Sequence, residues 1–341
     1  MSKNPEQKPL DAGDWFPWRM FVAAAGVACD PRVLLLAVVG LFFSHVGETA
    51  WWNSEWETVA VELPEEEISF AVVDLINASV DAMQSYLAGF ESYPIGKWQG
   101  WLTTPWGWMA LCVWTAVGAA IARIAALRLT HHEVGSFRKA IDAAWETTLP
   151  RIGVVLGLGL IHTLMWGVVW LLGTAASSPT FGGLVDFFLP LVLLFAALPA
   201  LLGLCIAVGW PLMTAAAGVE RPDAFDLVSR GIAYAYQRPL RLVVYLAQAW
   251  VVGVVGGGVA HLLARSVMRV ASVWLETRGG ELTGMAAVWW WAGEHLPMVY
   301  HAAYFWSAAV VIYLLLRRDI DEQQADEIFL EAADVDQAAG E

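Results

Sequence analysis

Six long apolar stretches constrain the fold of this chain more than any other feature. A helix needs about 20 mostly apolar residues to cross the hydrocarbon core of a bilayer. Stretches of about that length lie at 32–52, 105–128, 151–174, 183–214, 240–263 and 298–316. We therefore predict an all-α protein, a polytopic integral membrane helical bundle with six spans in a membrane domain covering 32–316.

The composition excludes several classes of protein and supports a membrane location. Charged residues make up 15% of the chain, whereas soluble domains contain about 25%. A net charge of −14 offers nothing to neutralise phosphates, so we expect no nucleic-acid partner. Twenty tryptophans favour membrane–water interfaces. The expected anchors at the headgroups are Trp51, Trp52, Trp106, Trp289, Trp290 and Trp291.

The distribution of Lys and Arg predicts the orientation, because these residues concentrate in short cytoplasmic loops. With the N-terminus inside, 15 of the 19 basic residues fall in segments on the cytoplasmic side. This predicts a multi-pass protein of the cytoplasmic (inner) membrane with both termini in the cytoplasm. Residues 1–31 would form a tail with an amphipathic helix, and 317–341 an acidic tail. Segments 53–104 and 264–297 would be extracytoplasmic and partly helical, with 259–276 extending the fifth span.

A threefold internal repeat is the second prediction about architecture. Each cytoplasmic segment contains a helix-like stretch with a Phe, then a proline, a nearby arginine and a new apolar span. Proline fits the first turn of a helix, so it can mark where a surface helix ends and a spanning helix begins. The repeat unit would be an amphipathic helix plus a transmembrane hairpin. Its marker residues are Pro31 and Arg32, Pro150 and Arg151, and Pro239 and Arg241.

The third copy carries a resemblance to a known family. RPDAFDLVSRG at 221–231, followed by YQRP at 236–239, resembles the cytoplasmic repeat of bacterial polytopic proteins similar to the membrane domain of glycerophosphoryl diester phosphodiesterase. The resemblance covers about forty residues well. It implies a helical membrane domain and no catalytic residues. No soluble stretch here is long enough to hold the phosphodiesterase catalytic domain.

Ionisable and polar residues inside the apolar stretches are the candidates for a functional site, because such residues are costly in a membrane. We consider a polar cavity for a ligand or ion, lined by His45, Glu48, His162, Asp186, Gln248, His261 and His301. The alternative is that they are separate residues reaching headgroup water. No pair on one helix has the spacing of metal ligands, so we predict no metal site.

Three functions remain open. Catalytic motifs such as GxSxG and Walker A are absent from the sequence, and we expect no cofactor. The preferred hypothesis is therefore a non-enzymatic, membrane-organising or accessory scaffold. Its partners would be the lipid bilayer and other membrane proteins or further copies of the chain. The alternatives are a small-molecule or ion transporter, and then an intramembrane enzyme acting on lipids. Parallel repeats weigh against transport, since transporter repeats are commonly inverted.

Overall fold

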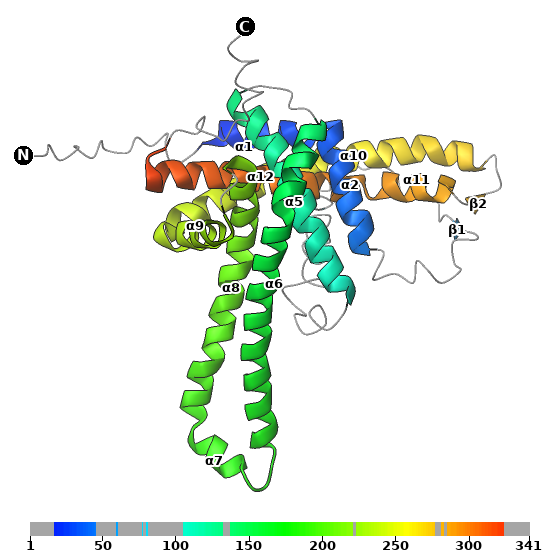
Figure 1. The fold of residues 1–341 in the computed structure, drawn as a ribbon. Helices are drawn as coiled ribbons and strands as arrows, with labels where there is room; N and C mark the ends of the chain where they lie inside the picture. The colour runs from blue at the N-terminus through cyan, green and yellow to red at the C-terminus, as the bar shows by residue number, and fades with distance from the viewer. Residues whose placement is uncertain are drawn as a thin grey trace, which may run out of the picture.

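The computed structural model describes residues 17–45, 59–60, 77, 80, 105–131, 137–220, 223–276, 281–282 and 285–323. Apart from two short strands, the elements within these ranges are helices (Figure 1). The helices are α1 (Trp18–Ala28), α2 (Pro31–His45), α5 (Pro105–His131), α6 (Phe137–Ala176), α7 (Gly182–Phe187), α8 (Leu189–Val219), α9 (Ala224–Gln237), α10 (Pro239–Glu276), α11 (Met285–Glu294) and α12 (Leu296–Asp321). The strands are β1 (Val59–Ala60) and β2 (Glu281–Leu282), which pair antiparallel.

Five of these helices are long and apolar enough to cross a membrane. They are α5, the part of α6 after Pro150, α8, most of α10, and α12. A sixth span is possible if α1 and α2, which meet at an angle of 73°, act as one broken span. The predicted all-helical chain with several membrane-length helices is therefore confirmed, while six spans and a threefold repeat stay predictions. As predicted, α10 continues unbroken through 259–276.

The repeat markers behave differently in the three copies. Pro31 and Pro239 each begin a helix directly after a shorter helix ends, as predicted. Pro150 does not, because α6 runs through it without a break. Losing one N–H removes a single hydrogen bond, which a long apolar helix tolerates. The shared Phe also differs, since Phe21 is fully buried whereas Phe225 is 81% exposed.

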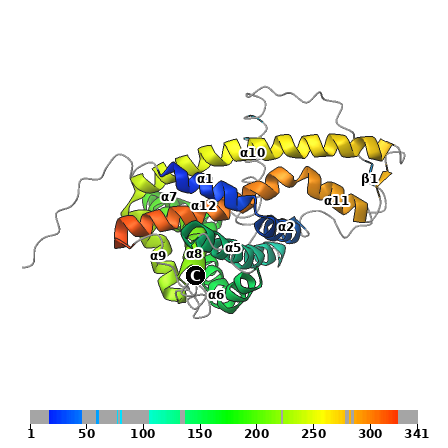
Figure 2. The ribbon, with the colours of Figure 1, turned by 90° about the horizontal axis from the view of Figure 1, so that it is seen from above.

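The helices pair as neighbours in three antiparallel hairpins: α2 with α5, α6 with α8, and α10 with α12. The α6–α8 hairpin projects from the bundle, with α7 at its tip, whereas α10 and α12 lie crosswise to it (Figure 1). Seen from above, α1, α10 and α12 lie side by side (Figure 2). The α6–α8 and α10–α12 hairpins therefore diverge from one shared end, where α8 and α12 finish and α10 begins.

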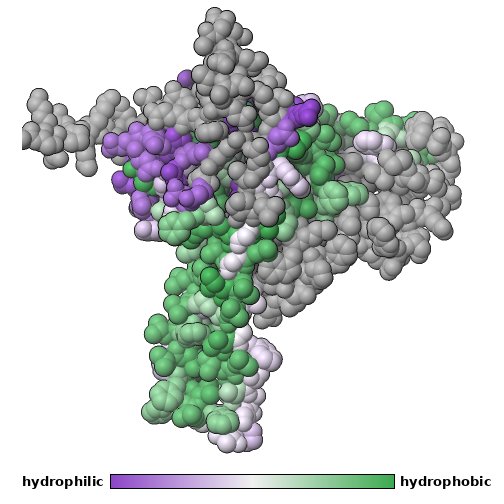
Figure 3. Space-filling model, in the orientation of Figure 1, coloured by the Kyte–Doolittle hydropathy of each residue, from purple (hydrophilic) through white to green (hydrophobic). Residues whose placement is uncertain are grey.

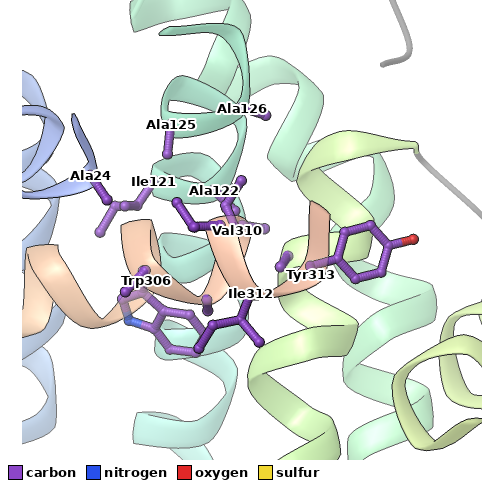
Figure 4. Close-up of a cluster of buried hydrophobic side chains, with 14 of the residues drawn as sticks. Ala24, Ile121, Ala122, Ala125, Ala126, Trp306, Val310, Ile312 and Tyr313 are labelled. Atoms are coloured by element: carbon purple, nitrogen blue, oxygen red, sulfur yellow. The ribbon is translucent and has the colours of Figure 1, made fainter. Parts of the chain in front are cut away.

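Helix α12 lies at the centre of the fold. In the apolar stretch of α12, 94% of the residues are buried, whereas only 6% are buried in the apolar stretch of α8. Trp306 is completely buried and stacks on Trp114 with ring centroids 6.1 Å apart. Trp210 meets the same indole edge-on at 5.3 Å. Figure 4 shows Trp306 and Val310 of α12 among the residues of the buried cluster, with Ile121 and Ala122 of α5 beside them.

Small residues let α12 approach the other helices this closely. A Cβ on Gly118 of α5 would lie 2.9 Å from the Trp306 indole. A Cβ on Gly256 of α10 would collide with the Tyr300 hydroxyl. Gly256 therefore serves close packing, and α10 is unbroken there.

Replacing Trp306 by Ala should destabilise the protein by about 3–5 kcal/mol, because the change leaves a large cavity among buried rings. Unfolding in mild detergent, followed by tryptophan fluorescence, measures the effect. Trp170→Ala is the control, because Trp170 is 65% exposed on α6. Equal losses of stability in the two variants would show that α12 is not the centre of the core.

Candidate functional site

The residues predicted to line a polar cavity do not form one group in the part of the chain that the structure describes. His162 is buried in α6, where its ring lies 3.1 Å from the position that a Cβ on Gly203 of α8 would take. Asp186 is exposed on α7 at the hairpin tip. Gln248 is buried and His261 half-buried in α10, and His301 is buried in α12.

The remaining candidates lie partly or wholly outside the described residues. Glu48, Trp51 and Trp52 fall outside them, and the side chains of His45, Trp106 and Trp291 are not described. Trp289 is 70% exposed on α11. The Trp290 indole N–H donates to Glu294 at 2.7 Å. Among the residues described, no three His, Cys, Asp or Glu side chains gather in a way that could hold a metal ion.

Within the described residues, a group of nine polar side chains lies instead at the shared end of the hairpins, and we call it the helix-end network. Its members are Glu220, Arg230, Tyr234, Arg241, Tyr245, Tyr313, Arg317, Asp319 and Asp321. They come from the end of α8, from α9, from the start of α10 and from the end of α12. Hydrophilic residues gather over α9 and this end of α12, whereas the projecting hairpin is hydrophobic (Figure 3).

Glu220 holds one half of the network together. Its carboxylate forms ion pairs with Arg230 of α9 and, at 3.1 Å, with Arg317 of α12. It also accepts a hydrogen bond of 3.0 Å from the Tyr313 hydroxyl. The Arg317 side chain is only 4% exposed, so its buried charge needs the Glu220 carboxylate. Glu220 thereby fixes the end of α8 to the end of α12.

Asp319 holds the other half in the same way. Its carboxylate pairs with Arg241 at the start of α10 and accepts a 2.7 Å hydrogen bond from Tyr245. Tyr234 of α9 donates to Asp321. Burial, followed by this bond to a carboxylate, raises the pKa of Tyr234 above its ordinary value, so the hydroxyl keeps its proton and remains a donor.

A second, smaller arrangement joins α2 to α5. Asp30 stands directly before α2 and accepts the backbone N–H of Arg32 at 2.9 Å, which is the usual role of an N-cap. Its carboxylate also pairs with the Arg32 side chain at 3.0 Å and with Arg128, at the end of α5, at 2.9 Å. Burial alone would raise the pKa of Asp30, but the hydrogen bonds and charges of the two arginines lower it below its ordinary value.

The sequence prediction named two of the basic residues in these contacts and none of the acidic ones. Arg32 and Arg241, two of the repeat markers, pair through their side chains with Asp30 and Asp319. Arg151, the third marker, is buried. The available signal was the presence of acids a few residues after the apolar spans, at Glu220 and Asp319.

No family model, curated protein or solved structure matches this chain.

Replacing Asp319 by Ala should cost about 3–5 kcal/mol of stability, because the buried Arg241 loses its carboxylate counter-charge. Asp142→Ala is the matched control, since Asp142 pairs with Arg138 on an exposed face of α6. That change should stay within about 0.5 kcal/mol. Chemical unfolding in detergent measures both, and similar values would show that the network contributes no more than a surface pair.

The contribution of Asp30 should depend on pH in a defined direction. Because its folded pKa lies below the ordinary value of 3.8, its contribution is present above that value and lost as the pH falls through the folded pKa. The stability difference between wild type and Asp30→Asn should be constant at neutral pH and shrink below pH 3.8. Melting temperatures measured across this range test it. A difference that first shrinks near neutral pH would contradict the assignment.

Proposed function

We propose that this chain is a non-enzymatic, polytopic protein of the cytoplasmic membrane that acts as a membrane-organising or accessory scaffold. The observation that carries the proposal is the contrast between a filled centre and an uncovered periphery. Around α12 the bundle is occupied by indole, phenol and aliphatic side chains, including Trp306 and Tyr313. Along α6 and α8 the apolar side chains face outward over the length of a bilayer.

Six spans with both termini in the cytoplasm remain the preferred topology. The helix-end network and the Asp30 arrangement join segments that the basic residues assign to the cytoplasmic side, namely the starts of α2 and α10 and the ends of α5, α8 and α12. The β1–β2 pair joins the two segments assigned to the outside. Because the α6–α8 and α10–α12 hairpins lie crosswise to each other, both must tilt strongly for six spans to cross one bilayer (Figure 1). The 35-residue apolar length of α10 suits such a tilt.

Uncovered apolar surface of this kind fits lipid or another membrane protein. Leu191, Leu194 and Leu201 on α8 are each about three-fifths exposed. Contiguous exposed apolar side chains on a folded chain mark contact with a membrane or a partner. A scaffold would use the buried centre for rigidity and the projecting hairpin for contact. The resemblance of 221–239 to the repeats of a helical membrane domain agrees with this proposal.

The transporter alternative is supported by buried polar side chains within the apolar helices, at His162, Gln248 and His301. These three lie on α6, α10 and α12. A transport pathway would require them to line a common route through the protein.

One experiment separates the two functions. The purified chain is reconstituted into liposomes, and the flux of protons, alkali cations and small neutral solutes is measured. The scaffold proposal predicts flux equal to that of empty liposomes. In native membranes, a photocrosslinker at Leu194 should join the chain to a neighbouring membrane protein whose abundance falls when this chain is deleted. The same group at the buried Leu315 is the control.

Saturable flux in the wild type would contradict the scaffold proposal if it disappears in Gln248→Ala or His301→Leu while the melting temperature is preserved. The chain would then be a transporter. The imidazole of His301 makes no hydrogen bond within the described residues, so leucine at this position should not harm folding. The same position therefore tests function without confounding it with stability.

A further inference from the structure

The α6–α8 hairpin contacts the remainder of the described chain at one end only. On α6 the residues buried before the hairpin leaves the bundle are Ala140, Ala144, Thr148 and Arg151. Beyond them, the only buried residues are Gly159 and His162, and His162 faces Gly203 of α8. Along the outer two-thirds of the hairpin, the two helices therefore pack mainly against each other.

A proline stands in each helix where it leaves the bundle. On α8 the residues from Gly209 to Val219 are buried except Pro211, which is half-buried near the start of this segment. On α6 the corresponding residue is Pro150, directly before the buried Arg151. A proline inside a helix removes one backbone hydrogen bond and is the commonest cause of a sharp kink.

The two prolines lie at nearly the same height along the hairpin. The contact between His162 and Gly203 provides a common reference level. From it, Pro150 is about 18 Å and Pro211 about 12 Å toward the bundle, at a rise of about 1.5 Å per residue. The difference is about one helical turn. Both helices thus lack a backbone hydrogen bond within about one turn of the same level.

The bundle side of this level is firmly held. A Cβ on Gly218 of α8 would approach Ala122 of α5 to 2.8 Å, and the Gly218 carbonyl accepts a hydrogen bond of 3.3 Å from Arg123. Gly231 of α9 packs so closely on Met213 that a side chain there would collide with it. The helix-end network fixes the last residue of this segment, Glu220.

We propose that Pro150 and Pro211 form a paired hinge about which the outer part of the α6–α8 hairpin swings as a rigid arm. The arm extends from this level to the α7 tip, and its helices stay together through the His162–Gly203 contact. The base is held by α5, α9 and α12. Hinges in proteins are a few residues that absorb the change in backbone angles while the elements beside them move as units.

Distances between paired spin labels in lipid nanodiscs test the hinge. Cys29, Cys112 and Cys205 are first replaced by Ala. One label is placed at Thr180 near the tip and one at Ser229 on α9, both exposed. The tip-to-base distance should be broadly distributed in the wild type. It should narrow to a single peak in Pro150→Ala/Pro211→Ala. Pro199→Ala, which changes a proline within the arm, should leave the distribution broad.

A second label pair keeps the test decisive if the double variant does not fold. Labels at Val22 of α1 and Ser229 of α9 report on two parts of the base, and both positions are exposed. This pair should give a narrow distribution in the wild type while the tip-to-base pair gives a broad one. Equal widths for the two pairs, or equal narrowing by Pro199→Ala and the double variant, would overturn the proposal.

Discussion

The packing of the other helices around α12 is the interaction on which the fold depends. Helix α12 is apolar enough to face lipid, yet almost all of it is covered by protein. Tryptophan rings from α5 and α8 meet Trp306, and glycines in α5 and α10 allow the close approach. In a membrane, van der Waals contact of this kind drives helix association, because lipid tails supply no hydrophobic force between helices.

The ion pairs at the helix ends determine which helix ends pack together. Glu220 ties the end of α8 to α9 and α12, and Asp319 ties the start of α10 to the end of α12. Each acid also accepts a tyrosine hydroxyl. Because a buried charge left without its partner is costly, these contacts restrict which helix ends can meet. They explain why the hairpins converge at one end and diverge at the other.

The sequence predicted the helices well and their arrangement less well. Apolar length located α5, α8 and α12, and the prolines at 31 and 239 located two helix starts. Pro150 misled, because the same residue that begins a helix is also tolerated inside one. Hydropathy cannot distinguish a helix covered by lipid from one covered by protein, so the central place of α12 was not foreseen. The acidic partners of Arg32 and Arg241 depend on three-dimensional contacts that spacing alone does not reveal.

The position of α12 has a consequence for biosynthesis. The segment around which the others assemble is also the last helix to leave the ribosome among those described. Until α12 is made, Trp114 of α5 and Trp210 of α8 lack the indole of Trp306 on which they pack. A chain truncated before residue 296 would therefore leave both tryptophan rings without this partner.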